Sequence, residues 1–140
     1  MAERSDIERL AGVDLFKGLA RKELGVIAGL AKELSFPEGA VVAEEGRQGG
    51  RFFLILDGEA KVTIRSRTRR RLRAGDYFGE ISLIDGEPRS ATIVAATPLR
   101  TLALAEWNFR SVLLAHPSIA RKLLVELCRR LRSAESSATA

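Results

Sequence analysis

The sequence predicts an α+β fold that is mainly β, of the sandwich or jelly-roll type, with helices at both ends. Three observations support this prediction. Apolar residues recur at helical spacing up to Leu34, short apolar segments separated by turn residues fill positions 36 to 105, and helical spacing returns from Glu106 onward. Strands this short and this regularly spaced are typical of sandwiches and jelly rolls.

Two helices are expected in the N-terminal part of the chain. Residues 4–13 (RSDIERLAGV) predict a short first helix. Residues 21–34 (RKELGVIAGLAKEL) predict a second helix, because five of their apolar residues recur at helical spacing. These five residues are Leu24, Ile27, Ala28, Ala31 and Leu34.

The central part of the chain shows the turns and alternations of β-structure. Residues 40–43 (AVVA) predict a short strand, and residues 51–65 (RFFLILDGEAKVTIR) predict a hairpin. In this hairpin the pair Asp57-Gly58 fits the left-handed dihedral angles of a tight turn. Further strands are expected at 71–75, 90–96 and 99–105, the last two joined by a turn at Thr97-Pro98.

Helical spacing from Glu106 onward predicts two closing helices, the second beginning at Pro117. An apolar stripe runs along the second of these helices, and it favours core or partner interface over a ligand site. The stripe consists of Ile119, Leu123, Leu127 and Leu131, with Ala120, Leu124 and Cys128 beside them. Residues 133–140 (SAESSATA) are small and polar, which predicts a disordered tail after a single domain over 1–132.

Composition narrows the function classes. A chain of 140 residues suits one domain, and no apolar run approaches the ~20 residues that cross a bilayer, so we expect a cytoplasmic location. A single histidine and a single cysteine argue against a zinc site, a cupin-like metal enzyme or a serine triad, so we expect no enzymatic activity. The net charge of +5 leaves nucleic acid as a partner to consider.

Much of the positive charge lies in the run RSRTRRRLR, residues 65–73. This run predicts either a nucleic-acid patch or the solvated rim of a hairpin. The rim is favoured, because the run contains no aromatic residue for base stacking and no recognition helix follows it.

The segment DYFGEISLIDGEPRSATI, residues 76–93, has the chemistry of a phosphate-binding loop. Gly79 allows close backbone approach, and a helical turn beginning at Glu80 would aim the free amides of Ile81 and Ser82 at an anion. Arg89 adds a fork of donors suited to phosphate, and Ser90 can add a hydroxyl. Glu80 fits if the ligand also carries sugar hydroxyls, as a nucleotide does. The alternative is a simple surface ion pair between Glu80 and Arg89.

The two blocks FGEISLI (78–84) and PRSAT (88–92), with the preceding Gly75-Asp76, resemble the phosphate-binding cassette of cyclic nucleotide-binding domains. The nine-position step from Glu80 to Arg89 is most similar to the versions in protein kinase A regulatory subunits and bacterial cyclic-nucleotide-gated potassium channels. The resemblance implies an eight-stranded antiparallel jelly-roll β-barrel. It also implies that Glu80 holds the ribose 2′-hydroxyl and that Arg89 holds the cyclic phosphate.

The resemblance further implies which residues line the ligand and which ligand it is. Ser90, rather than threonine, after the arginine favours cAMP over cGMP. In the channel version an arginine of the last helix lies over the purine, and Arg130 matches it here. Arg129 or Leu127 are the substitutes for this role. The alternative is that the CRRLR segment complements the helix dipole and contacts no ligand. The expected ligand set is Phe78, Gly79, Glu80, Ile81, Ser82, Arg89, Ser90, Ala91, Val62, Leu72 and Arg130, with Ile64 also plausible at the barrel wall.

The resemblance predicts a regulatory sensor whose last helix moves when the nucleotide binds. After Arg132 only SAESSATA remains, which does not fit a DNA-binding domain. We therefore expect either a stand-alone sensor that acts through an effector protein or the excised regulatory domain of an activator-type transcription factor or a channel. A homodimer through the last helix is a further expectation. A cGMP sensor and, less favoured, a nucleic-acid binder using the arginine run are the alternatives.

Overall fold

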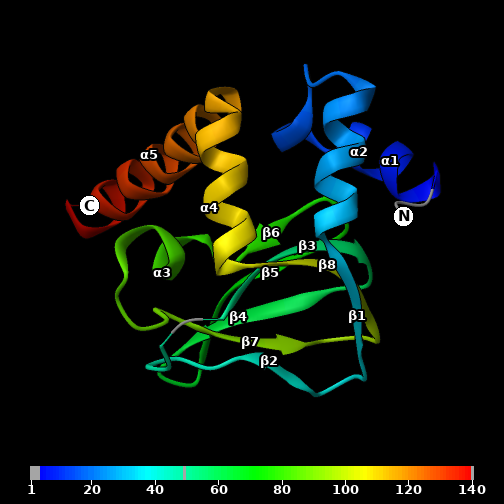
Figure 1. The fold of residues 1–140 in the computed structure, drawn as a ribbon. Helices are drawn as coiled ribbons and strands as arrows, with labels where there is room; N and C mark the ends of the chain where they lie inside the picture. The colour runs from blue at the N-terminus through cyan, green and yellow to red at the C-terminus, as the bar shows by residue number, and fades with distance from the viewer. Residues whose placement is uncertain (1–3, 49, 140) are drawn as a thin grey trace.

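The computed structural model describes residues 4–48 and 50–139. Two four-stranded antiparallel sheets, with strand orders β1-β8-β3-β6 and β2-β7-β4-β5, lie below a group of helices (Figure 1). The strands are β1 (Lys32–Phe36), β2 (Val41–Ala43), β3 (Arg51–Asp57), β4 (Ala60–Ile64), β5 (Arg67–Leu72), β6 (Tyr77–Phe78), β7 (Thr92–Ala95) and β8 (Leu99–Ala105). The predicted mainly-β architecture of eight antiparallel strands is confirmed.

The helices lie at both ends of the chain and in one short central segment. They are α1 (Arg4–Ala11), the 3₁₀ helix η1 (Asp14–Phe16), α2 (Arg21–Leu30), α3 (Glu80–Asp85), α4 (Glu106–Ala115) and α5 (Pro117–Thr139). Figure 1 shows α1, α2, α4 and α5 on the same side of the sheets, with α3 beside them at the barrel edge. No helix within the described ranges is both long and apolar enough to cross a bilayer.

The second predicted helix ends earlier than expected. It ends at Leu30, and Ala31 already has extended dihedral angles, φ −83° and ψ 151°. Residues 32–36 form β1, which pairs with β8 so that Leu34 lies opposite Thr101. The expectation that the helix reaches Leu34 was wrong because Leu34 packs into the core between the two sheets, where strand pairing with β8 outweighs helical periodicity.

The predicted hairpin around Asp57-Gly58 was also wrong. The strands on either side do form, but β3 pairs with β6 and β8, whereas β4 pairs with β5 and β7. The turn therefore carries the chain from one sheet to the other. It packs against the turn at Thr97-Pro98, where the amide of Glu59 donates to Thr97 Oγ1 at 3.0 Å. A Cβ on Gly58 would lie 2.2 Å from the Pro98 carbonyl oxygen, so the two turns are in close contact.

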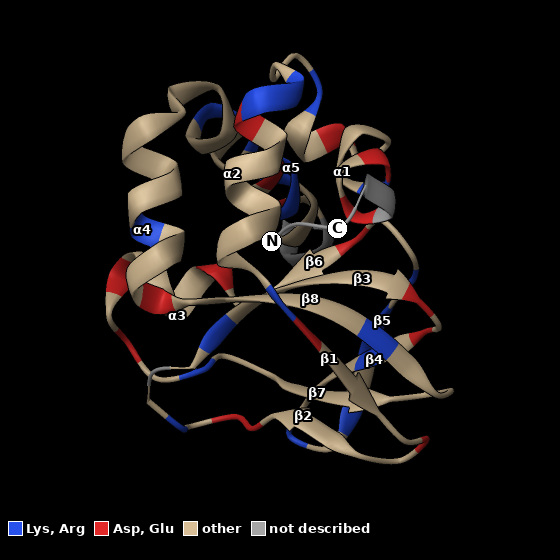
Figure 2. Ribbon diagram, turned by 45° about the vertical axis from the view of Figure 1, so that its right-hand side comes forward, with Lys and Arg blue, Asp and Glu red and all other residues tan. Residues whose placement is uncertain are grey.

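The true hairpin joins β4 to β5. Its turn contains Arg65 and Ser66, both with positive φ, 52° and 67°. The arginine run forms this turn and β5, and five of the six residues of β5 are exposed. The run therefore lies on a hairpin, and exposure alone does not separate a solvated rim from a nucleic-acid patch. Figure 2 shows the basic residues of β5 at the edge of its sheet.

Two cores stabilise the domain. β3 is buried from Phe52 to Leu56 because it is covered on both faces. Phe52, Leu54 and Leu56 pack against the helices, whereas Phe53 and Ile55 pack between the two sheets. The strands are thereby held rigidly beneath the helices, which positions the segment between β6 and β7.

α5 packs well only up to Leu123. Ile119 and Leu123 are each 1% exposed, but Leu124, beside the predicted stripe, and Leu131, its last member, are 61% and 59% exposed. The helix continues to Thr139, and the disordered tail over residues 133–140 stays a prediction. The segment contains neither glycine nor proline, and alanine and glutamate favour helix continuation.

Candidate functional site

A small cavity of about 180 Å³ lies between the β4–β5 hairpin, α3 and α5. It brings together ten of the eleven residues predicted from the sequence, together with Ile64. The ten are Val62, Phe78, Gly79, Glu80, Ile81, Ser82, Arg89, Ser90, Ala91 and Arg130. The eleventh, Leu72, lines a neighbouring cavity instead. Their role as ligand contacts stays a prediction.

Gly79 sets the entry of the chain into α3. Its φ of 94° lies in the left-handed region, which glycine adopts without strain. A Cβ at this position would lie 2.3 Å from the Arg51 carbonyl oxygen and 2.7 Å from Arg89 Nη1. Glycine is therefore required both by the turn and by the close approach of Arg89, and Glu80 follows directly on the first turn of α3.

Glu80 is a buried carboxylate, 3% exposed, facing this cavity. Its Oε2 lies 3.4 Å from Arg130 Nη2, an ion pair that lacks hydrogen-bond geometry. Glu80 Oε2 and the neighbouring Ser82 Oγ are both buried without a hydrogen-bond partner among the described residues. Buried polar atoms are nearly always satisfied, so these two mark a place where a ligand donor could bind.

Arg89 reaches the same cavity from the segment before β7. It is 8% exposed, and its Nη2 donates to the Arg51 carbonyl at 2.9 Å. Burial lowers the pKa of Arg89, and the negative charge of Glu80 opposes that shift. A Cβ on Gly50 would lie 2.1 Å from Arg89 Nη2. The guanidinium is therefore held in a tight backbone cradle, which orients it for a fixed partner.

Arg130 is the residue of α5 that enters the site. Besides Glu80, it pairs with Glu126, with 3.7 Å between Nε and Oε1, and its side chain is 25% exposed. The substitutes considered from the sequence do not reach the small cavity. Arg129 is 74% exposed and pairs with Glu126, and Leu127 lines neither cavity. The geometry thus supports Arg130 among the three alternatives, and its stacking on a base stays a prediction.

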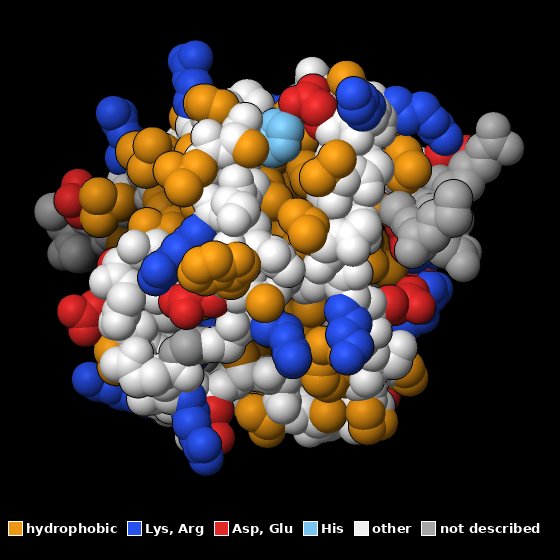
Figure 3. All heavy atoms as spheres, viewed as in Figure 1, with side chains coloured by type: hydrophobic (Ala, Val, Ile, Leu, Met, Phe, Trp, Pro, Cys, Tyr) orange, Lys and Arg blue, Asp and Glu red, His pale blue; other side chains and the backbone are white. Residues whose placement is uncertain are grey.

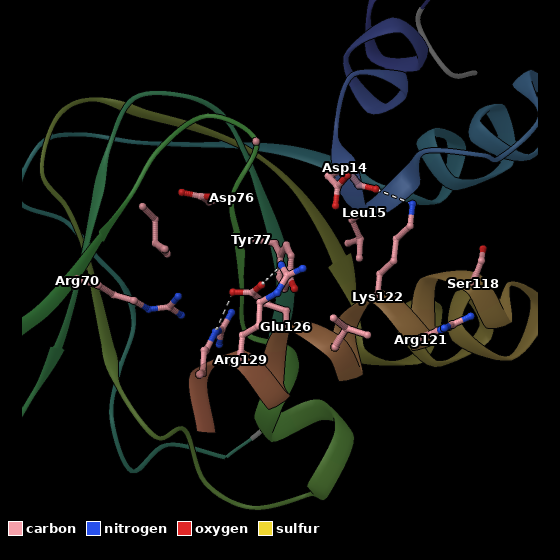
Figure 4. Close-up of a pocket in the computed structure, with 14 residues that line it drawn as sticks. Asp14, Leu15, Arg70, Asp76, Tyr77, Ser118, Arg121, Lys122, Glu126 and Arg129 are labelled. Carbon is pink, nitrogen blue, oxygen red and sulfur yellow. Dashed lines mark hydrogen bonds and ion pairs between the residues drawn. The ribbon is translucent and has the colours of Figure 1, made fainter. Parts of the chain in front are cut away.

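A larger cavity of about 550 Å³ adjoins the small one and lies between η1, β5, β6 and α5 (Figure 4). Arg70 and Arg130 line both cavities. The remaining lining residues are Asp14, Leu15, Leu72, Gly75, Asp76, Tyr77, Ser118, Arg121, Lys122, Val125, Glu126 and Arg129. Burial, followed by the charge of Glu80, raises the pKa of Tyr77 to about 12.

Sequence reasoning missed Arg69 and Arg70, which both line the small cavity. The sequence favours a solvated rim for the whole arginine run, residues 65–73. A signal was present in the alternation of β5, since Arg70 lies two positions before the apolar Leu72 and therefore shares its face of the strand. Recognising it required the strand to begin at Arg67 rather than at Arg71.

Comparison with known proteins identifies the family. The sequence profile of the cyclic nucleotide-binding domain matches residues 33–116. A cyclic nucleotide-gated potassium channel of Mesorhizobium japonicum is 36% identical over 79% of this chain and 31% of the channel. A CRP-like cAMP-activated global transcriptional regulator of Mycobacterium tuberculosis is 34% identical over 89% of this chain and 58% of the regulator. The chain thus spans less than two thirds of either relative.

Solved structures agree with this assignment. A cAMP-bound PfPKA-R chain superposes with a TM-score of 0.85 at 25% identity, covering 98% of this chain and 47% of that one. The Thermus thermophilus catabolite activator protein gives a TM-score of 0.80 at 30% identity, covering 89% and 61%. Sequence, fold and cavity therefore agree, and the chain belongs to the cyclic nucleotide-binding domain family.

Proposed function

We propose that this chain is a regulatory module that binds cAMP in preference to cGMP and reports its occupancy through α5. The observation that carries the proposal is the buried carboxylate of Glu80. It faces a cavity that Arg89 also lines, and its Oε2 has no hydrogen-bond partner among the described residues. A ligand that offers a hydroxyl donor beside an anion fits both groups, and a ribose 3′,5′-cyclic phosphate has this combination.

The two charged residues have different tasks in this proposal. Glu80 accepts a hydrogen bond from the ribose 2′-hydroxyl, which satisfies the buried Oε2. Arg89 donates hydrogen bonds to the phosphate oxygens. Burial lowers the pKa of Arg89, and the negative charge of the bound phosphate opposes this effect because it favours the charged guanidinium. Ser82 Oγ, buried and unpartnered among the described residues, provides a further polar contact.

The preference for cAMP depends on Ser90, which is exposed at the rim of the small cavity. Serine after the arginine offers a hydroxyl without the methyl group of threonine. Different relatives are named for different nucleotides. The regulator of M. tuberculosis is described as cAMP-activated. A kinase of Eimeria tenella that is 38% identical over 64% of this chain is described as cGMP-dependent. The two ligands must therefore be compared directly.

The output of the module passes through α5. Arg130 of α5 forms an ion pair with Glu80 in the structure. A ribose that binds Glu80 therefore changes the contact that holds this part of the helix. Exposed hydrophobic side chains on the helices offer a surface to an effector protein or to a second copy of the chain (Figure 3). They are Val26, Leu30, Ile84, Trp107, Leu114, Leu124, Val125 and Leu131.

Calorimetry on the purified chain tests the proposal directly. Titration with cAMP and with cGMP should give saturable binding of both, with the tighter dissociation constant for cAMP. 5′-AMP, which lacks the cyclic phosphate, serves as the matched control and should bind more weakly. If neither cyclic nucleotide binds with a dissociation constant below about 100 μM, which corresponds to a binding free energy near −5.5 kcal/mol, the proposal is rejected.

A further inference from the structure

One arginine of the β4–β5 hairpin faces the ligand side of the barrel. In the strand register Arg70 lies opposite Val62, and Leu72 lies opposite Ala60. Val62 and Leu72 are 6% and 3% exposed. Because side chains alternate along a strand, Arg70 shares this inward face with Leu72, whereas Arg71 points to the other face.

Arg70 is exposed on β5, but the part of its side chain that faces the cavities lies beside another cation. Burial lowers its pKa, and the positive charge of Arg130 lowers it further, against weaker opposing effects of Glu80, Asp76 and Glu126. Within the described ranges the Arg70 side chain forms neither a hydrogen bond nor an ion pair. Because Arg70 is exposed, water can solvate its charge, and it is the position of Arg70 opposite Arg130 on both cavities that points to a ligand contact.

Arg70 and Arg130 belong to two elements that face each other across the cavities. Arg70 is on β5 and Arg130 is on α5, and both line the small cavity as well as the large one. In Figure 4, Arg70 extends from the barrel side toward the side chains of α5. The two guanidinium groups therefore flank the passage from the small cavity, with Glu80 and Arg89, to the large one.

The group that lies in this passage must tolerate a cation on each side. If the proposed function is correct, the ribose and the cyclic phosphate occupy the small cavity, and the base extends from the ribose toward the large one. A purine presents a negative π-face on either side, and an arginine can stack on each face. A flat base between the two guanidinium groups also reduces their mutual repulsion.

We propose that Arg70 is a base-stacking residue that, together with Arg130, holds the purine between two guanidinium groups and selects purine over pyrimidine cyclic nucleotides. The inference rests on the proposed function and adds a specificity-determining residue to it. Stacking involves the ring face rather than the exocyclic groups, so the contribution of Arg70 is the same for any purine. A pyrimidine has a smaller face and gains less from the contact.

Calorimetry with three ligands tests this role. The ligands are cAMP, purine riboside 3′,5′-cyclic monophosphate and cCMP, and the proteins are the wild-type chain, Arg70→Leu and Arg71→Leu. Leucine at 70 preserves the inward apolar contact with its neighbours. Arg71→Leu removes the same charge from the outward face of the same strand, and thermal unfolding of both variants verifies that they fold.

Arg70→Leu should bind both purine ligands about 5- to 30-fold more weakly, and cCMP by a clearly smaller factor. Arg71→Leu should bind all three within about 2-fold of wild type. An equal loss for all three ligands that disappears in about 0.5 M salt, which screens charges beyond about 4 Å, would show long-range attraction of the phosphate and overturn the stacking role. Unchanged purine binding in Arg70→Leu would also overturn it while leaving the proposed function intact. If the wild-type chain binds none of the ligands, both are rejected.

Discussion

Arg130 of α5 is paired with the buried Glu80 of α3, with 3.4 Å between Nη2 and Oε2. Glu80 is the carboxylate that we propose to bind the ribose, so the ligand and the last helix use the same group. Beyond Leu123, α5 has few other anchors, since Leu124, Val125 and Leu131 are exposed. The pair is therefore both a fastening point for the helix and the place where a ligand would affect it.

The first prediction concerns the energy of this pair. Arg130→Gln removes the cation and leaves Glu80 buried without its partner, so the free energy of unfolding should fall by about 1 to 3 kcal/mol. In the double variant with Glu80→Gln, no uncompensated carboxylate remains, and the loss should be smaller than the sum of the two single losses. Urea unfolding of the four proteins measures the coupling.

Arg129→Gln is the matched control for this cycle. Arg129 is next to Arg130 on α5 but its side chain is 74% exposed, and it pairs with Glu126 at the helix surface. This variant should change the free energy of unfolding by less than about 0.5 kcal/mol. Additive losses in the Glu80 and Arg130 variants would show that the two residues do not stabilise each other.

The second prediction concerns Gly79. Alanine at this position adds a Cβ 2.3 Å from the Arg51 carbonyl oxygen and strains a left-handed backbone, so both stability and ligand binding should be lost. Gly18 provides the matched control, since its φ is 92° but a Cβ there meets nothing within 4 Å. Gly18→Ala should lose about 1 to 2 kcal/mol from backbone strain alone.

Chemical unfolding and cAMP titration of both glycine variants measure the difference. Gly79→Ala should lose about 3 kcal/mol or more, in the range of severe core mutations, and its cAMP affinity should fall even under conditions where it is folded. Gly18→Ala should bind as wild type does. Equal effects of the two substitutions would mean that the contact with Arg51 and Arg89 is unimportant.

The fold could be predicted from the sequence where periodicity is local, and not where pairing is distant. The strands on both sides of Asp57-Gly58 follow from their apolar residues, but whether they pair with each other depends on the Thr97-Pro98 corner far along the chain. Likewise, the residues after Leu30 continue a helical pattern, and only pairing with β8 makes them a strand. Local patterns thus identify elements but not their partners.

The grouping of the candidate residues around one cavity could be predicted better than the topology, whereas their role as ligand contacts stays a prediction. The glycine, the carboxylate and the arginine lie in one continuous segment, so their order alone predicts that they meet around α3. The contribution of β5 could not be read in the same way. Arg70 differs from the other arginines of the run only in the face of the strand on which it lies, and that face is defined by the register with Val62.

The third prediction uses Tyr77, the only tyrosine of the chain. Its pKa is raised to about 12 by burial and by the charge of Glu80. The folded protein therefore retains the phenolic proton at a pH where the unfolded chain has lost it. Stability from this source is complete below pH 10, the ordinary pKa, and is lost as the pH rises toward 12.

Tyrosinate absorbance gives the measurement, because no other residue contributes to it. The titration midpoint of the wild-type chain should lie near 12, and Glu80→Gln should lower it by removing the second cause of the shift. Tyr77→Phe should lack the additional loss of stability above pH 10. A midpoint near 10 in a chain that circular dichroism shows to be folded would contradict the burial of the phenol.

The last prediction concerns Arg89 and separates its structural contact from its ligand contact. Arg89→Ala removes a charge-assisted hydrogen bond to the proposed phosphate, and cAMP affinity should fall by about 1.5 to 3 kcal/mol, roughly 10- to 150-fold. It also removes the bond to the Arg51 carbonyl, so unfolding must be measured alongside binding. Arg71→Ala, on the exposed face of β5, is the control and should leave both quantities nearly unchanged.

Arg89→Lys distinguishes the two contributions of Arg89. Lysine keeps the positive charge but not the planar fork of donors, so it cannot bind two phosphate oxygens while also donating to Arg51. We expect Arg89→Lys to regain part of the stability lost in Arg89→Ala but little of the cAMP affinity. Full recovery of affinity with lysine would mean that the site requires only a positive charge, and the backbone cradle formed by Gly50 and Gly79 would then have no role in orienting the ligand contact.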